Sequence, residues 1–215
     1  MSSTGPTGAR VQTVTEQEIA EAVKAGADLY WYARCLEVGA THAEVLEALR
    51  TGADLYWYYV CRKAGATPAE VLEAHEAGAE LHDYARCREV GTTHAEVLEA
   101  LGAGADLSGY VNCSAAGATH TEVLEAHGAG ASTHWYASCR RTGATHAEAM
   151  ALRLSKAGRE PHGPAKLAVP ALRAVGGPGP TRELGEVIAT LAQDWAGTPG
   201  ELAATAMALL APGPS

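Results

Sequence analysis

Five evenly spaced cysteines are the first residues in the chain that could do chemistry. They stand 26 residues apart, at Cys35, Cys61, Cys87, Cys113 and Cys139. Zinc binds sulfur at about 2.3 Å, and a disulfide needs Cα atoms within roughly 7 Å of each other. Equivalent residues of neighbouring helical units lie at helix-packing distance, about 8–10 Å apart. We therefore expect buried free thiols in a packed core, and neither a metal nor a cofactor.

The nine histidines offer a second candidate chemistry. Four recur once per unit, directly after a helix start, and we expect them on the surface at the edge of a stack: His42, His94, His120 and His146. The pairs His75/His82 and His127/His134 are conceivable transition-metal ligands. The chain has no Cys-x-x-Cys, His-Glu-x-x-His, phosphate loop or nucleophile elbow. We interpret the protein as non-enzymatic, with a metal- or thiol-dependent enzyme as the least favoured alternative.

The 26-residue period identifies the elements that position these residues. Thr41/Glu44 and Thr67/Glu70 are two of a series of capping boxes that open the first helix of each unit, and Gly52 and Gly78 end it. Asp28 and its equivalents begin a second helix. Helices this short are marginal alone in water, so the units must stack. The sequence predicts an all-α fold, a right-handed α-solenoid of 26-residue helix-turn-helix repeats with a C-terminal helical hairpin.

The repeat also predicts the domain boundaries. Residues 13–156 form the array, with five repeats and a half repeat, after a disordered N-terminus at 1–12. Residues 157–180 are a Gly- and Pro-rich linker that holds at most a short apolar docking segment around Leu167–Leu172. Residues 181–211 form the C-terminal hairpin, whose second helix opens with Thr198, Pro199 and Glu201.

Comparison of the units with one another separates a constant frame from a variable surface. Leu29 and Tyr32, with their equivalents, form the expected core stripe. Three neighbouring positions of the second helix vary between units: Tyr30, Trp31 and Arg34; Tyr56, Trp57 and Val60; His82, Asp83 and Arg86; Ser108, Gly109 and Asn112; His134, Trp135 and Ser138. Because Trp and Tyr suit binding surfaces, we interpret these trios as a ligand-binding ribbon anchored by Trp31, Trp57 and Trp135. The alternatives are drift at exposed positions and rings that fill the seam between repeats.

The order Thr-Pro-x-x-Val, Gly, Cys-x-x-x-Gly, clearest from Thr67 to Gly91, resembles the repeat of TAL-effector-like DNA-binding proteins. The resemblance covers about 140 residues and implies two-helix units that each read one base. The turn at Thr51-Gly52 and Ala77-Gly78, where that family places its code, hardly varies here. The resemblance makes a modular DNA-binding protein the alternative function. A broader likeness to tetratricopeptide-type α-solenoids implies an interaction module.

Charge and composition limit the partners. The chain carries 16 Lys and Arg against 25 Asp and Glu, a formal charge of -9, which argues against nucleic acid and anionic membranes. It lacks a run of about 18 apolar residues and an apolar stretch near its start, so we expect no membrane insertion and a cytoplasmic location. The expected partner is a peptide or protein, or a sequestered aromatic small molecule, either neutral or cationic. The oligomeric state is left open.

Overall fold

The computed structural model describes residues 14–152, 165–175 and 182–211. These residues form 14 α-helices and no strand, so the all-α solenoid is confirmed. The chain forms two compact units, unit 1 from Met1 to Glu89 and unit 2 from Val90 to Ser215. No helix in the described ranges has the length and apolar character needed to cross a membrane. The predicted disordered N-terminus and most of the predicted linker lie outside the described residues.

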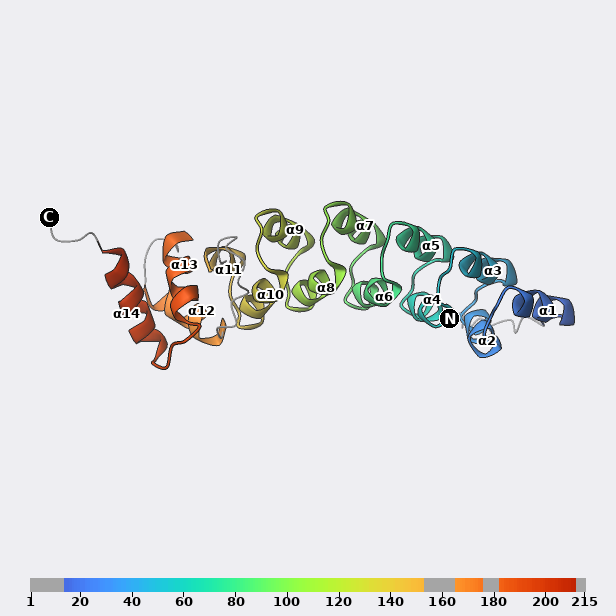
Figure 1. The fold of residues 1–215 in the computed structure, drawn as a ribbon, viewed down its shortest axis with the longest axis horizontal. Coiled ribbons are helices and arrows are strands. Elements are labelled where there is room, and N and C mark those ends of the chain that lie inside the picture. Colours follow the sequence, from blue (N-terminus) through green and yellow to red (C-terminus); the bar gives the residue numbers. More distant parts are fainter. Residues whose placement is uncertain (1–13, 153–164, 176–181, 212–215) are drawn as a thin grey trace, which may run out of the picture. The chain divides into compact units, whose positions relative to one another are not determined.

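Unit 1 contains α1 (Glu16–Lys24), α2 (Leu29–Glu37), α3 (His42–Arg50), α4 (Leu55–Lys63), α5 (Pro68–Glu76) and α6 (Leu81–Glu89). Unit 2 contains α7 (His94–Gly102), α8 (Leu107–Ala115), α9 (His120–Gly128), α10 (Thr133–Arg141), α11 (His146–Ala151), α12 (Ala165–Ala174), α13 (Arg182–Leu191) and α14 (Pro199–Leu210). Odd-numbered helices up to α11 are the first helices of the repeats, and we call them A helices. Helices α2, α4, α6, α8 and α10 are the B helices. Within each unit the two kinds form separate rows (Figure 1).

The predicted helix ends are present. In α5, for example, the Thr67 hydroxyl accepts from the Glu70 amide at 3.2 Å, while the Thr67 amide donates to Glu70 Oε2 at 2.7 Å. Gly78 follows this helix with φ 89°, a left-handed conformation in which a side chain would be strained. Each repeat therefore starts and stops its helices by local chemistry, before any packing.

The B helices stack through the predicted core stripe. Leu55 is 5% exposed, and Tyr58 and Cys61 are fully buried. The Cys61 thiol donates to the Leu81 carbonyl on the next B helix at 3.3 Å, and Cys35 repeats this contact with Leu55 O at 3.6 Å. Leu29 is the exception at 45% exposure, because α2 is the first B helix of the unit and no earlier one covers it.

The A helices are joined by a three-residue bridge, which we call the Tyr-His-Glu bridge. In unit 1, Tyr32 Oη lies 2.9 Å from His42 Nδ1, and His42 Nε2 lies 3.1 Å from Glu21 Oε2 on the preceding A helix. Unit 2 has the same bridge twice: Tyr110, His120 and Glu99; Tyr136, His146 and Glu125. These histidines, expected on the surface at the edge of the stack, are instead held between two neighbours and are only 15–21% exposed.

One repeat of unit 1 lacks this bridge. Pro68 stands where the other repeats have His, and Pro has no side-chain hydrogen-bonding group. The Tyr58 hydroxyl is buried and has no hydrogen-bond partner among the described residues. An unsatisfied buried hydroxyl costs about 1–3 kcal/mol. Repeat 2 therefore gains a preorganised helix start from Pro68 and loses a hydrogen bond to the next A helix.

Helix α12 takes the place of a B helix in the sixth repeat. Arg140 on α10 donates to Gly117 O at 2.9 Å and lies 3.3 Å from Glu122 Oε1. Arg173 on α12 makes the equivalent contacts 26 residues further on, with Gly143 O at 2.7 Å and Glu148 Oε1 at 2.8 Å. The buried face of α12 is formed by Ala168, Val169, Ala171 and Leu172. Residues 165–174, which the sequence pattern assigns to the linker, are thus part of the stack.

Tyr58 and Tyr32 provide a matched test of the bridge. Tyr58→Phe removes a hydroxyl that has no partner, so we expect the free energy of unfolding to stay unchanged or rise slightly. Tyr32→Phe removes the contact with His42 and should lower it by about 1 kcal/mol. Urea unfolding followed by circular dichroism measures both. Equal destabilisation by the two variants would mean that the bridge does not join the A helices.

The Glu148–Arg173 contact predicts a pH dependence. Hydrogen bonding to Arg173 is the main cause that lowers the pKa of Glu148 to about 2, from an ordinary 4.5. The folded state binds this proton less readily than the unfolded state, so the contact stabilises fully above about pH 4.5 and is lost as the pH falls toward 2. Hydrogen exchange of residues 165–174 should therefore accelerate over this range. Glu148→Gln, which keeps a capping-box residue, should exchange faster at neutral pH and lose that added pH dependence; an unchanged profile would contradict the assignment.

Candidate functional site

Unit 1 carries a continuous set of aromatic side chains on its B helices. We call it the aromatic strip: Tyr30 and Trp31 on α2, Tyr56, Trp57 and Tyr59 on α4, and His82 on α6. Ring centroids are 4.8 Å apart for Tyr30–Trp31 and 4.7 Å for Trp31–Tyr56. The path continues at 4.6 Å to Trp57 and 5.6 Å to His82. Three successive repeats are therefore linked by rings in contact.

The aromatic strip lies outside the core of its helices. Tyr30 is 62% exposed and Tyr56 is 38% exposed, whereas Tyr32 and Tyr58, two residues further along the same helices, are at most 3% exposed. Trp31 and Trp57 are half-buried beneath the two exposed tyrosines. The strip is thus a layer of rings that rests on the frame and leaves its outer faces open to solvent.

Each exposed tyrosine stands two residues after the aspartate that caps its B helix. Asp28 is the N-cap of α2, and its Oδ1 accepts from the amides of Tyr30 at 2.8 Å and Trp31 at 3.2 Å. Asp54 caps α4 in the same way, accepting from the Trp57 amide at 3.1 Å. Both aspartates are exposed. An exposed carboxylate therefore caps the same helix end that carries each Tyr-Trp pair.

The aromatic strip already holds one guanidinium group. Arg34 Cζ lies 5.4 Å from the centre of the Tyr59 ring, and Arg34 Nη2 donates to Tyr59 Oη at 3.3 Å. Arg34 Nη1 lies 2.6 Å from Glu37 Oε2. Tyr59 and then Glu37 raise the pKa of Arg34. One tyrosine and one carboxylate are thus sufficient to seat an arginine side chain on this surface.

The strip ends in charged residues on α6. Asp83 is only 6% exposed, with its Oδ2 3.3 Å from His82 Nε2 and its Oδ1 3.4 Å from Arg86 Nη1. Of this trio, His82 and Arg86 are accessible, whereas Asp83 is a buried residue that pairs with both. Val60 on α4 is half-buried.

The two variable trios of unit 2 are arranged differently. Gly109 is buried, and a Cβ atom there would lie 2.2 Å from Thr133 Oγ1, so α8 and α10 touch at this point. Trp135 is 5% exposed, and its indole N–H donates to Leu152 O at 3.0 Å. It is therefore a core residue that holds the end of α11, and the prediction of an exposed anchor is wrong here. Asn112 Oδ1 accepts from Arg141, His134 is exposed, and Ser108 and Ser138 are half-buried.

Sequence reasoning missed Tyr59 as a member of the strip. Its equivalents in the other repeats are Ala33, Ala85, Val111 and Ala137, so the position reads as part of the frame. Tyr59 lies 5.9 Å from Trp31 and carries the Arg34 side chain. The signal that could have found it is a single large ring at a position otherwise occupied by small side chains.

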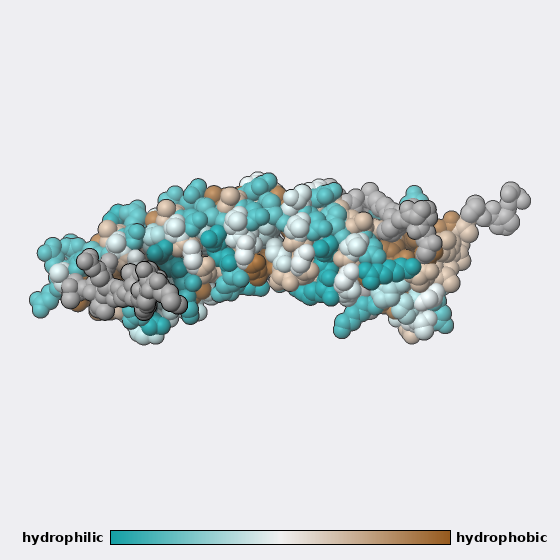
Figure 2. Space-filling view, turned by 180° about the vertical axis from the view of Figure 1, so that it is seen from behind, coloured by the Kyte–Doolittle hydropathy of each residue, from teal (hydrophilic) through white to brown (hydrophobic). Residues whose placement is uncertain are grey.

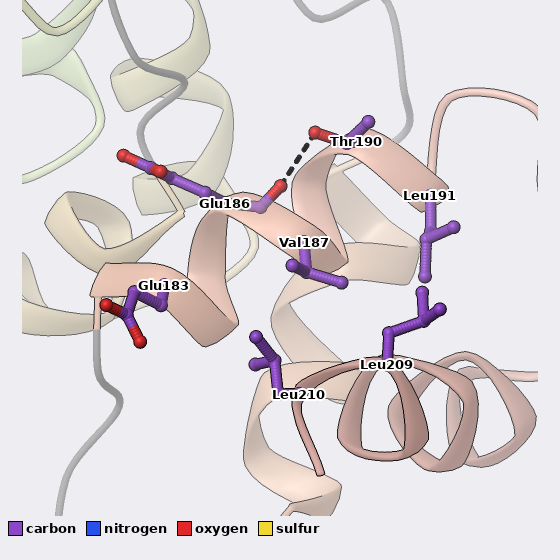
Figure 3. A pocket seen from close by; sticks show the side chains of 7 residues that line it. All are labelled: Glu183, Glu186, Val187, Thr190, Leu191, Leu209 and Leu210. Atoms are coloured by element: carbon purple, nitrogen blue, oxygen red, sulfur yellow. Dashed lines mark hydrogen bonds between the residues drawn. The ribbon is translucent and has the colours of Figure 1, made fainter. Parts of the chain in front are cut away.

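A cavity of about 460 Å³ lies between α13 and α14 in unit 2. Val187, Leu191, Leu209 and Leu210 face it, while Glu183 and Glu186 point away from these four side chains (Figure 3). Figure 2 shows hydrophobic surface over the C-terminal hairpin, at the right of that view. The sequence does not predict this cavity, which offers apolar contacts and no converging set of polar groups.

His75, His127 and the five cysteines are engaged in packing, whereas the other candidate metal-binding histidines, His82 and His134, are accessible. His75 Nε2 lies 3.2 Å from Thr51 O, and His127 Nε2 lies 3.2 Å from Ala103 O, so both bind the end of an earlier A helix. No group of three or more His, Cys, Asp and Glu residues suited to a metal ion occurs in the described ranges. Burial raises the pKa of Cys35 and Cys61 to about 12.

No protein-family model matches the chain, and no curated protein matches it.

The cysteine environment predicts thiol inertness. All five thiols are buried, and the thiolate is the reactive form, so the folded protein should not react with Ellman's reagent at neutral pH. In guanidinium chloride all five should react. Rapid labelling of any cysteine in the folded protein would contradict the packing role and restore the thiol-enzyme alternative.

Proposed function

We propose that this protein is a non-enzymatic binding protein whose aromatic strip holds an extended peptide segment of a protein partner. The observation that carries the proposal is the unbroken run of ring contacts from Tyr30 to His82 on a regular helical frame. Tyrosine and tryptophan give large contact areas at low entropic cost and dominate binding hot spots. An exposed run of such rings fits recognition better than drift, which has no reason to keep neighbouring rings in contact.

The ring geometry favours a peptide over a flat aromatic small molecule. A ligand ring clamped between two protein rings needs those rings about 7–8 Å apart, twice the distance of a carbon contact. Trp31 and Tyr56 are 4.7 Å apart at an angle of 62°, and Tyr56 and Trp57 are 4.6 Å apart at 61°. Neighbouring rings therefore fill the space between them edge-on. A ligand that lies along their outer faces fits without moving them.

The repeat resemblance to TAL-effector-like proteins supports the second function, DNA reading, less well. Residues 14–89 carry seven basic and fourteen acidic side chains, a net charge of −7. Asp28 and Asp54 cap the helices that carry the strip, and its Arg34 is paired with Glu37. Phosphate binding needs the opposite sign of charge. A steep loss of duplex-DNA affinity with rising salt would be the mark of this alternative.

The test is selection from a displayed peptide library with the full-length protein. Wild type should enrich a family of peptides, and Tyr30→Ala with Tyr56→Ala should weaken their binding roughly tenfold or more, since aromatic anchors contribute over about 1 kcal/mol each. Both side chains are exposed, so circular dichroism should show unchanged helicity. His134→Ala, at the equivalent exposed position of unit 2, is the matched control and should bind normally. Peptides that bind the double variant as tightly as wild type would refute the proposal.

A further inference from the structure

The residues of the aromatic strip indicate the charge of its ligand. This inference rests on the proposed function and concerns the same surface. We propose that the ligand is an arginine-bearing peptide segment, whose guanidinium groups lie over the exposed rings of Tyr30 and Tyr56 beside the carboxylates of Asp28 and Asp54.

The protein itself already holds one arginine side chain on a ring of this surface. Arg34 lies over Tyr59 at 5.4 Å while Glu37 binds the same guanidinium at 2.6 Å. A guanidinium group is planar and weakly hydrated, so it stacks on rings more readily than an ammonium group does. Tyr30 and Tyr56 are exposed rings, each two residues after an exposed aspartate. The strip thus offers two further exposed rings on helices that begin with a carboxylate.

The capping aspartates disfavour an anionic ligand at the same place. The N-termini of helices α2 and α4 would attract anions through their free amides. Asp28 Oδ1 already accepts from the amides of Tyr30 and Trp31, and Asp54 Oδ1 accepts from that of Trp57. The capping carboxylates therefore occupy the anion position. A carboxylate has about four acceptor sites in total, so each still has capacity for a guanidinium donor.

The length of the aromatic strip fits a short extended peptide. The ring contacts limit the Tyr30–Tyr56 centroid distance to at most about 9.5 Å, and the whole path from Tyr30 to His82 to at most about 20 Å. An extended chain rises about 3.3 Å per residue and turns alternate side chains to one face. About six residues cover the path, and two arginines separated by one residue, about 6.6 Å apart, fall within reach of both tyrosines. The structure therefore favours an Arg-x-Arg segment over a single small cation.

The test uses the full-length protein and a capped hexapeptide, Ala-Arg-Ala-Arg-Ala-Ala. Its analogue with citrulline in place of both arginines has the same shape and no charge. Calorimetric titration should show at least tenfold tighter binding of the arginine peptide, and this advantage should disappear near 1 M salt, where the screening length is about 3 Å. Equal affinity of the two peptides, or no binding of either at millimolar concentration, would overturn the inference. Arginine amide binding as tightly as the hexapeptide would also overturn it, in favour of a small cation.

Two substitutions isolate the carboxylates. Asn is as good an N-cap as Asp, so Asp28→Asn with Asp54→Asn removes both charges and keeps the helix starts. The double variant should bind the arginine peptide about tenfold more weakly and the citrulline peptide unchanged. Asp106→Asn, the equivalent cap on α8 with no ring beside it, should have no effect. An unchanged affinity of the double variant would contradict the role of these aspartates.

The two proposals fail in different ways. If the displayed library yields peptides without arginine that depend on Tyr30 and Tyr56 and bind the Asn double variant normally, the strip is a peptide site and only the arginine inference is wrong. If nothing selected depends on Tyr30 and Tyr56, the proposed function is wrong as well.

Discussion

The constraint on which the whole structure depends is that no repeat can bury its own apolar stripe. Each repeat helix up to α10 is nine residues long, too short to be stable alone in water. Leu55 is 5% exposed with a B helix before it, whereas Leu29, the same residue without that neighbour, is 45% exposed. Stacking is therefore the source of stability. Hydrogen bonds from the Cys61 thiol and the His42 side chain also connect one repeat to the next.

Stacking also decides which variable positions become surface. In unit 1 the frame uses Leu55, Tyr58 and Cys61, which leaves the next positions of the helix turned outward for rings. In unit 2 Gly109 and Trp135 are taken into the packing, because α10 approaches Gly109 closely and Trp135 reaches the Leu152 carbonyl, while His134 stays exposed. A single repeat pattern can thus place a half-buried ring at one repeat and a core contact at another.

The sequence predicts the features that local chemistry determines. The capping box at Thr67, the left-handed glycine at Gly78 and the buried cysteines follow from residue types alone, as does the period. The sequence does not predict contacts between side chains of different repeats, because the 26-residue period does not show which partner residue is present. Pro68 leaves Tyr58 without a partner, Tyr59 enlarges the strip from a frame position, and Arg173 replaces Arg140 at 33 residues instead of 26, which hides α12 from the repeat pattern.

The aspartates at the starts of the B helices connect the fold to the proposed chemistry. Asp28, Asp54 and Asp106 are needed as caps wherever a B helix begins, whatever the protein binds. Only in the first two repeats do a tyrosine and a tryptophan follow the cap, so only there does a capping aspartate begin a helix with an exposed tyrosine. Each cap accepts from one or two amides of its helix, and its exposed carboxylate keeps acceptor capacity for a further donor. An aspartate that the fold needs as a helix cap can in this way also favour cationic ligands on the aromatic strip.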